Sequence, residues 1–554
     1  MAWGGGNANS VESWVKRLRE NDSSFTSLHI LSFRRITPSE LGQVFEALAA
    51  NTTLTELYAS GHALDESSAQ HLADALQQNR TLERLNIGND TMGAHTNVIQ
   101  ILAAGLAKSK GGLVRLDLEN KGLGGHEASV KALADALLTN DTLQELNLAR
   151  NKLTDQDIAV LCQSLAQNTT HSLQKLDLCL NSFTEQGTRS VADFLASQDQ
   201  HQQGGLKEID LSDNEITEEG GMAIGRALET NKHLERLRMS SCMDPPLPVE
   251  DDDKDKIQWD DQIEVLNRPL SEDQAIEIRS DGDAVLEALA AALKTNETLQ
   301  EIWMDYCNIS SIGAASLADA LWQNRGLTTI RMRNNRIGNR GARALGAALT
   351  PAHSPDQASA ASAGETTSGE HNTALKNLEL GSNKIGVLGW NGLVGASSLE
   401  SLGLFENHIN VLHEAMEGHL TASSSLTTSS SELSTPATVG ANIPNGASSA
   451  NRVLEKLAHL DVGCNAISRE AFTQLGVCLI KGLLPSLIRL EIAGNGDRSR
   501  APPQNPGDDD DDSEPGSEDP DDEQHAWERV ASKIEEARPG LGIHWKGAGA
   551  MQQG

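Results

Sequence analysis

Arginine side chains around one tryptophan form the strongest candidate binding site in this 554-residue sequence. Arg236, Arg238, Trp303, Arg331 and Arg333 occupy equivalent or adjacent places in three consecutive copies of a repeated pattern. Tryptophan and arginine are the residue types that most often carry the binding energy of protein interfaces. We expect an exposed indole with four positive charges around it, which favours an acidic protein partner. The alternative is that the arginines stack on the indole for local structural reasons and bind no partner.

A second zone on the same predicted face is acidic and consists of Asp117, Glu119, Asp177, Glu208 and Asp210. Its residues come from earlier copies of the repeated pattern. Neighbouring strands lie about 4.8 Å apart, so side chains at equivalent places on successive strands touch. The sequence therefore predicts one acidic and one basic zone on a single surface.

Catalytic and metal-binding motifs are missing from the sequence. It has no phosphate-binding GxxxxGK[ST], no Rossmann glycine fingerprint and no G-x-S-x-G elbow. His413 and Glu414 begin like a zinc-protease helix, but the residue four positions after His413 is Glu417. The aspartate runs 251–253 and 508–512 lack the glycine turn and spaced ligands of a calcium loop. We expect no catalytic residue, no metal and no cofactor.

The elements that must position these residues come from an internal repeat. The octet LADALQQN at 72–79 recurs as LADALLTN at 133–140 and as LADALWQN at 317–324, each followed by a short strand-like segment. The unit reads L-x-x-L-x-L-x-x-N-x-I, then a turn, then a helix with leucine and alanine at three- and four-residue spacing. Its first leucine falls at Leu28, Leu54, Leu82, Leu113, Leu143, Leu173, Leu206, Leu234, Leu299, Leu327, Leu375, Leu399, Leu457 and Leu487.

The spacing of this unit predicts a solenoid. Leucines two residues apart share one face of a strand, and the helix adds an apolar stripe from the other side. One unit cannot bury these faces, so the units stack, with fourteen parallel strands on the concave face and helices on the convex face. The side chain between the second and third leucines points into the concave face, where we place both charged zones.

Asparagine recurs at two places in the unit. The ninth position is usually asparagine, whose amide can satisfy backbone groups where the chain leaves the strand. It is cysteine at Cys242 and Cys307, which we interpret as structural, and it departs from the pattern at Ile36, His62, Asp90 and Lys121. A second asparagine precedes the repeat start by three residues, at 51, 79, 140, 231, 296 and 324. We interpret it as a helix C-cap in the left-handed conformation.

The period of 28 to 30 residues with a helical second half resembles the ribonuclease-inhibitor-like subfamily of leucine-rich repeats. That subfamily includes ribonuclease inhibitor, the Ran GTPase-activating proteins and the repeat domains of nucleotide-binding immune receptors. The resemblance covers about residues 28–500. It implies an α/β fold, a right-handed horseshoe, and it specifies function weakly because the same horseshoe serves many partners.

The domain organisation follows from breaks in the period. An N-terminal segment with a capping helix (1–27) precedes the repeats (28–500), which are interrupted by an acidic insertion (243–283) and by two Ser/Ala-rich segments (351–373 and 421–451) that we predict to be flexible loops. An acidic, disordered linker (501–524) and a short amphipathic helix with a tail (525–554) follow. The insertion (4 − 14 = −10) and the acidic tract 508–523 (−11) together hold −21 of the net charge of −33.

Composition limits the partners and the compartment. The net charge of −33 disfavours nucleic acid and anionic membrane surfaces as partners. Six scattered cysteines without a CxxC pair, and an N-terminus without a signal-peptide pattern, favour a soluble, monomeric, reduced protein of the cytoplasm, with the nucleus or its surroundings as an alternative.

Two functional hypotheses follow. The first is a non-catalytic scaffold that binds a protein partner on its concave face. The second, implied by the resemblance and by the acidic C-terminal tract, is a Ran-type activator of a small GTPase in nucleocytoplasmic transport. Against it, the acidic tract is short and precedes another helix, and no segment matches that family's catalytic loop.

Overall fold

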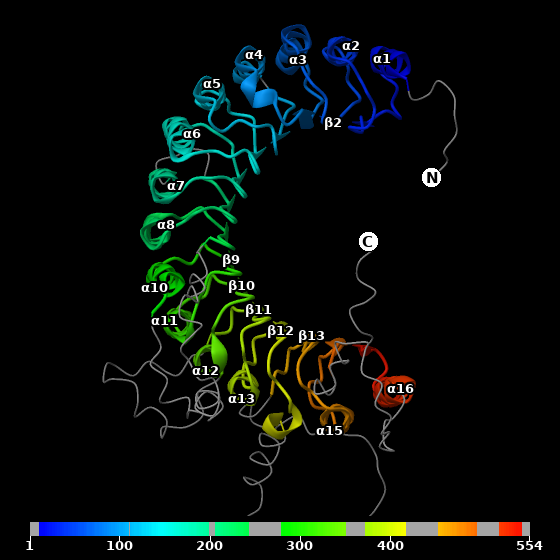
Figure 1. Ribbon diagram of the computed structural model, residues 1–554, viewed down its shortest axis with the longest axis vertical. Helices are drawn as coiled ribbons and strands as arrows, with labels where there is room; N and C mark the ends of the chain where they lie inside the picture. Colours follow the sequence, from blue (N-terminus) through cyan, green and yellow to red (C-terminus); the bar gives the residue numbers. More distant parts are fainter. Residues whose placement is uncertain are drawn as a thin grey trace, which may run out of the picture. The chain divides into compact units, whose positions relative to one another are not determined.

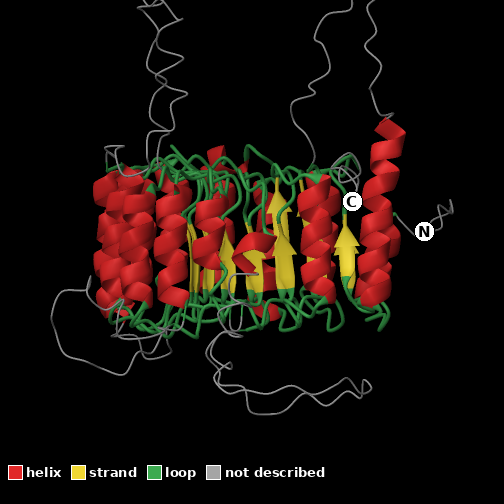
Figure 2. Ribbon diagram, turned by 90° about the horizontal axis from the view of Figure 1, so that it is seen from below, coloured by secondary structure: helices red, strands yellow, loops and turns green. Residues whose placement is uncertain are grey.

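The fold alternates short parallel strands with helices. The computed structural model describes residues 10–109, 111–198, 205–242, 279–350, 372–416, 453–495 and 520–545. They belong to two compact units, Met1–Pro245 with Ala288–Cys307, and Pro246–Glu287 with Asn308–Gly554. In each unit the helices line one face of the parallel sheet (Figure 1), and the strands all point the same way (Figure 2). This is the α/β solenoid that the sequence predicts.

The first unit holds nine strands, which pair in chain order. Its elements are α1 (Val11–Arg19), β1 (Ser27–His29), α2 (Pro38–Leu48), β2 (Glu56–Ser60), α3 (Glu66–Gln78), β3 (Arg84–Gly88), the 3-10 turn η1 (Met92–Ala94), α4 (Thr96–Ala107), β4 (Arg115–Asp117), α5 (Glu127–Leu137), β5 (Glu145–Asn147), α6 (Asp155–Gln167), β6 (Lys175–Asp177), α7 (Glu185–Ser197), β7 (Glu208–Asp210), α8 (Glu218–Thr230), β8 (Arg236–Arg238) and β9 (Glu301–Trp303). Pairing is parallel from β1 through β9.

The described part of the second unit holds six strands with the same pairing rule. Its elements are α11 (Ser311–Leu321), β10 (Thr329–Arg331), α12 (Gly338–Leu349), β11 (Asn377–Glu379), α13 (Val387–Leu393), β12 (Ser401–Gly403), β13 (His459–Asp461), α15 (Arg469–Ile480), β14 (Arg489–Glu491), α16 (Pro520–Ala537) and β15 (Gly542–His544). Pairing is parallel from β10 through β15. Helix α10 (Asp281–Leu293) contributes residues to both units.

The core lies between the strands and the helices, because the leucines of each strand point toward the helix that follows. Leu116, Leu146 and Leu176 are in register on β4, β5 and β6 and are all buried. Each buried leucine side chain removes apolar surface from water, and this stabilises the fold by about 25 cal/mol for every Å² that is buried. The side chains on either side of these leucines point to the opposite face of the sheet, which is where the charged zones lie.

A ladder of buried asparagines fixes the exit of the chain from each strand. The Asn151 side chain donates to the carbonyls of Leu118 and Leu148, at 2.8 and 3.0 Å, and accepts from the backbone N–H groups of Lys121 and Leu123. One amide therefore satisfies backbone groups of two successive repeats, as the ninth position predicts. Cys307 replaces it with an Sγ that lies 3.0 Å from the carbonyl oxygen of Met239, and it is buried, so its predicted structural role is confirmed.

The second asparagine series has another role than the one predicted. Asn79 ends α3 with φ −72° and ψ 137°, which is extended backbone and not the left-handed region. Its side-chain amide donates to the carbonyls of Leu48 and Asn51, and its oxygen accepts from the N–H groups of Thr81 and Leu82. The left-handed C-cap interpretation is therefore wrong. These asparagines form a second buried ladder, which ties each helix end to the previous repeat.

The register of the first repeat differs from the prediction. Leu28 pairs with Leu57, so it is the second leucine of its repeat and not the first. A repeat start at Leu28 would place Ser32 on the concave side, but His29 takes that strand position, and Ile36 is not a ninth position. The shift arises because a phenylalanine, Phe25, replaces the first leucine, and its buried ring fills the same place in the core.

The described ranges contain fifteen strands, where the sequence predicts fourteen. The additional strand β15 pairs with β14 through Ile543 and Leu490. It follows α16, which packs on α15 and begins at Pro520, five residues earlier than the predicted 525. Similarly, α10 begins at Asp281, inside the predicted 243–283 insertion. Residues 243–278, 351–371, 417–452 and 496–519 lie outside the described ranges.

Candidate functional site

The Arg238–Trp303 pair lies on two adjacent strands of the first unit. β8 and β9 place Arg238 opposite Trp303, and the guanidinium carbon lies 4.2 Å from the centre of the indole ring. Trp303 is half-buried, so the expectation of an exposed indole is wrong. One reason is this arginine, which covers part of the ring as a cation–π contact.

Glu208 on β7 forms ion pairs with three cationic side chains of this region. Its carboxylate lies 2.6 Å from Lys175 Nζ, 2.9 Å from Arg236 Nε and 3.0 Å from Arg238 Nη1. The Glu208 side chain is only 7% exposed. Burial alone would raise the pKa of Glu208, but the hydrogen bonds from Lys175 and Arg236 and the charge of Arg238 bring it below its usual value. The positive charges of Arg236 and Arg238 are therefore partly compensated by a buried carboxylate of the predicted acidic zone.

The five residues of the predicted basic patch divide between the two units. Arg236, Arg238 and Trp303 belong to the first unit, and Arg331 and Arg333 to the second. Arg333 pairs with Glu379 on β11, with 2.7 Å between Nη2 and Oε2. Its charge is thus also matched by a carboxylate of its own unit.

The aspartates of the concave face accept backbone hydrogen bonds in addition to carrying a negative charge. The Oδ1 atoms of Asp117, Asp177 and Asp210 each accept from the backbone N–H two residues later, at 2.9 to 3.0 Å. Asn147 makes the same bond to Ala149 at 2.9 Å. An oxygen at this position is therefore what the backbone requires, and the negative charge is additional to that requirement.

Among the acidic residues of this zone, Asp177 has the negative charge that neighbouring side chains offset least. Glu119 pairs with Arg150 at 3.1 Å, and Asp117 accepts a further hydrogen bond from Asn86 at 2.7 Å. Across the described ranges, no cationic side chain lies within 4.0 Å of the Asp177 carboxylate. Burial first, and then the charge of Asp210, raise the pKa of Asp177 above its usual value. A positive charge brought to this place would stabilise the ionised carboxylate.

Sequence reasoning missed the cationic partners of this site. The residue directly before the second leucine also faces the concave side, and in the first unit from β2 to β9 it is always charged, positive in some repeats and negative in others. Arg84 pairs with Glu56 on the previous strand, Arg115 pairs with Glu145 on the next one, and Lys175 pairs with Glu208. The opposite charges at this second position in successive repeats are the signal that predicts these pairs.

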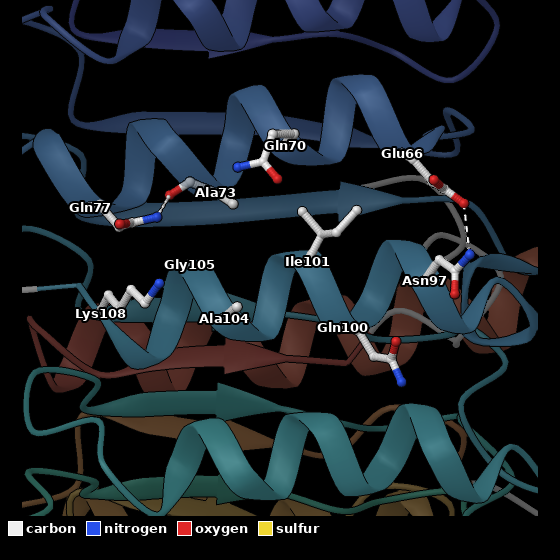
Figure 3. A pocket seen from close by; sticks show the side chains of 10 residues that line it. All are labelled: Glu66, Gln70, Ala73, Gln77, Asn97, Gln100, Ile101, Ala104, Gly105 and Lys108. Carbon is white, nitrogen blue, oxygen red and sulfur yellow. Dashed lines mark hydrogen bonds between the residues drawn. The ribbon is translucent and has the colours of Figure 1, made fainter.

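Two open hollows lie in the first unit, one on its helices and one beside the acidic zone, where Glu119 is among the lining residues. One, of about 380 Å³, lies between α3 and α4, where Glu66 accepts from Asn97 at 2.7 Å and Gly105 faces Ala73 (Figure 3). Its position on the helices separates it from the strand face. A side-chain Cβ at Gly105 would lie 2.6 Å from the Ala73 Cα, so glycine is required for this close approach of the helices.

The other hollow, of about 470 Å³, contains the buried Lys121 at the ends of β2, β3 and β4. Lys121 stands where the repeat has its ninth-position asparagine, and Nζ donates to Ser60 Oγ at 2.7 Å. Burial lowers the pKa of Lys121. The side chain links the repeat of β4 to that of β2, two repeats earlier, which is a structural role for this departure from the pattern.

We expect Glu208→Gln to lower the free energy of unfolding by about 2 kcal/mol, because three cations lose their shared buried anion while the side-chain shape is kept. Urea unfolding followed by circular dichroism measures the effect. Glu145→Gln is the matched control, since Glu145 is more exposed and pairs only with Arg115, and we expect a change of about 0.5 kcal/mol. Equal effects of the two variants would contradict the special role of Glu208.

Other kinds of site find no support within the described ranges. They contain no group of three histidine, cysteine or acidic side chains that is arranged to hold a metal ion. Among the described helices, none has the length and apolar character needed to cross a membrane. The aspartate runs 251–253 and 508–512 fall outside these ranges.

The chain is similar to several proteins built from the same repeat. A family model described as Leucine Rich repeat matches residues 139–162, 206–225 and 323–346. Ribonuclease inhibitor of Mus musculus is 29% identical over 282 residues, which is 50% of this chain and 57% of the inhibitor. Ribonuclease inhibitor of Sus scrofa is 29% identical over 280 residues, with the same shares. The chain thus spans little more than half the length of these relatives.

Two further similarities are more distant. "NACHT, LRR and PYD domains-containing protein 12" of Homo sapiens is 27% identical over 297 residues, 53% of this chain and 26% of that protein. The crystal structure of an internalin from Listeria monocytogenes has 14% identity over 88% of this chain and 89% of its own, but its TM-score of 0.38 adds nothing to the fold described above. The matched repeats, the parallel strand–helix units and the inhibitor relatives support a leucine-rich repeat protein of the ribonuclease-inhibitor-like type.

Proposed function

We propose that the protein is a scaffold without catalysis of its own, and that it binds a protein partner on the concave face of β4 to β9. One observation carries the proposal: Asp177 holds a half-buried negative charge on this face with no cationic partner in the described ranges. Asn147 shows that the backbone hydrogen bond at this position does not need a charge. A charge that costs stability and is not needed by the fold is a candidate contact for a ligand.

The charge balance of this face favours a basic partner surface. Arg236 already pairs with Glu208 and Glu235, and Arg238 with Glu208 and Asp210, while Asp177 has no ion pair within 4.0 Å in the described ranges. This reverses the expectation of an acidic partner, because the basic patch is not free to meet one. The Arg238–Trp303 stack borders the acidic residues and offers a rigid aromatic surface at the edge of the same contact.

The relatives support a protein as the ligand class. A ribonuclease inhibitor is, by its name, a protein that acts on another protein, and the repeats of this chain are of the same type. An interface of standard size needs about 800 Å² from each partner, which a row of several adjacent strands can supply.

The test begins with a photo-crosslinking amino acid at Asn147 on β5 and, as a control, at the exposed Gln163 on α6. We expect proteins to be captured from the Asn147 position and not from Gln163. Equal capture from both faces, or from Gln163 alone, would contradict binding on the strand face.

The captured partner is then titrated against charge variants. We expect Asp177→Asn, which keeps the hydrogen bond to Cys179, to weaken binding about fivefold by removing a charge that faces a basic surface. Glu229→Gln on the exposed end of α8 removes the same charge from the helix face and should leave affinity unchanged. Equal losses would show that only the net charge of the protein matters, and the proposed site would then be wrong.

A further inference from the structure

The repeat that carries β10 and α12 is strongly basic in an acidic chain. Between residues 320 and 350 the sequence has six arginines and no aspartate or glutamate, although the net charge of the whole chain is −33. One of these arginines, Arg336, directly follows the ninth-position Asn335 and is exposed. The equivalent residue of the next repeat, Lys384, follows Asn383 and is also exposed. Two positive side chains therefore occupy the same place in successive repeats of the second unit.

The buried asparagine ladder makes these two residues neighbours. The Asn383 side chain accepts from the N–H of Ile337, the residue after Arg336, at 3.2 Å. The N–H of Arg336 itself donates to the carbonyl of Ile309 in the previous repeat, at 2.7 Å. Equivalent places in neighbouring repeats lie about 4.8 Å apart at the strands. Arg336 and Lys384 thus lie side by side where the chain passes from strand to helix, and we call this edge of the second unit the strand-to-helix rim.

The charges on this rim have no counter-charge. Within the described ranges, no carboxylate lies within 4.0 Å of Arg336 or Lys384, whereas Lys376 pairs with Glu400 at 3.0 Å. The N-cap of α12, Ile337, also supplies no side-chain acceptor. The positive end of the α12 dipole therefore adds to the charge of Arg336. Exposed positive groups without a counter-charge favour an acidic occupant.

The acidic insertion joins the second unit on the same rim. Directly after the insertion, the Ser280 hydroxyl donates to the carbonyl of Asn308 at 2.7 Å. Asn308 holds the position in its repeat that Arg336 holds in the next repeat and Lys384 in the one after. The insertion therefore ends two repeats before Arg336 and three before Lys384.

The insertion has the charge and the length to reach both cations. Its residues 243–278, outside the described ranges, include three basic and twelve acidic side chains (3 − 12 = −9). Glu272 and Asp273 precede Ser280 by eight and seven residues. An extended chain covers about 3.4 Å per residue, so seven residues span about 24 Å. Three repeats cover only about 15 Å at the strands.

We propose that the acidic insertion 243–278 docks on the strand-to-helix rim, where its carboxylates form ion pairs with Arg336 and Lys384. Ion pairs at a surface are individually weak, and the short tether favours docking by raising the effective concentration of the segment. An acidic segment of a partner must compete with the insertion for this rim. The proposal uses no residue of the concave face of β4 to β9, so it does not rest on the proposed function.

The test couples amines to carboxylates in the full chain with a zero-length carbodiimide. Peptide mass spectrometry of the monomer then identifies the joined residues. We expect Lys384 to couple to carboxylates of 243–278 at low ionic strength, and at least about threefold less at ~0.5 M salt, because salt screens surface ion pairs. The Lys376–Glu400 pair is the positive control for the reagent. Lys481, exposed at the end of α15 in the same unit, is the negative control.

Two matched variants separate the rim from the net charge of the protein. We expect Arg336→Gln to lower the coupling of Lys384 to the insertion about threefold, because the docked segment loses one of its two cations. Arg343→Gln removes the same charge from the exposed side of α12, where Arg343 lies beside Gly392 of α13, and should leave the coupling unchanged. Both side chains are exposed, and circular dichroism checks that both variants are folded.

Three results would overturn the proposal. The first is that Lys384 couples to the insertion no more than Lys481 does, while the Lys376–Glu400 product forms. The second is an equal loss of coupling with Arg343→Gln and Arg336→Gln. The third is coupling of Lys384 to the acidic tract 508–523 in place of the insertion, which would assign the rim to another occupant. The experiment needs no partner protein, so its failure and the failure of the proposed function are separate outcomes.

Discussion

Trp390→Ala is expected to lower the free energy of unfolding of the second unit by about 4 kcal/mol, within the range for large aromatic side chains deleted from a core. Trp390 on α13 is fully buried, and its Nε1 donates to the carbonyl of Leu412 at 3.0 Å. The variant leaves a cavity and also a buried carbonyl without its donor. Both effects act on the helix that follows β11 and precedes β12.

The loss should be local, because the units of a solenoid contact only their neighbours. Hydrogen exchange followed by mass spectrometry should show faster exchange in β11 and β12 and unchanged exchange in β5. Trp322→Ala is the matched control, since this tryptophan lies at the end of α11 with 38% of its surface exposed. A uniform loss of protection over both units would contradict local unfolding, and equal effects of the two variants would contradict the role of burial.

The strands were predictable because their signal is repeated and strictly spaced. Leucines at the fourth and sixth positions must both be buried, so a shift by one residue would expose them. The first and last repeats were harder to predict, because they do not show the full leucine pattern. Phe25 fills the place of a leucine, so that Leu28 was assigned to the wrong position, and β15 shows the pattern only as Leu541 and Ile543.

The composition of the candidate site was predictable, but its charge balance was not. Sequence reasoning placed Glu208 with the acidic residues and Arg236 and Arg238 with the basic ones, according to their types. The structure joins all three in one cluster, because β7 and β8 are adjacent and Glu208 is buried between Lys175 and the two arginines. Which opposite charges meet depends on the register of neighbouring strands and on side-chain directions, which a residue type alone does not specify.

Phe405 shows a different limit. Its place in the repeat is readable from the sequence, since it follows the third leucine of its unit, but its exposure depends on the neighbours. Those neighbours, Gly381 and Gly463, lie 24 and 58 residues away in the chain and come beside it only through strand pairing. Comparison of equivalent positions in successive repeats places this aromatic ring between two glycines.

The asparagine ladder leads to the second large effect. Asn151→Leu is expected to lower the free energy of unfolding by about 3 kcal/mol, although leucine has nearly the same size. The substitution leaves the carbonyls of Leu118 and Leu148 without their donor and the N–H groups of Lys121 and Leu123 without their acceptor. Each unsatisfied buried group costs about 1 kcal/mol, and relaxation of the turn recovers part of the sum.

A graded series of variants tests this explanation. Asn151→Cys should lose less than Asn151→Leu, because Cys242 and Cys307 show that an Sγ at this position can reach the carbonyl of the previous repeat. A thiol is a weak acceptor, so the N–H groups of the turn stay poorly satisfied and the loss remains measurable. Asn147→Leu is the control within the same repeat, since that half-exposed side chain makes one hydrogen bond, to Ala149, and about 1 kcal/mol is expected. Urea midpoints that fall in the order wild type, Asn151→Cys, Asn151→Leu would support the ladder, and equal midpoints for these two variants would show that its hydrogen bonds to carbonyls contribute little.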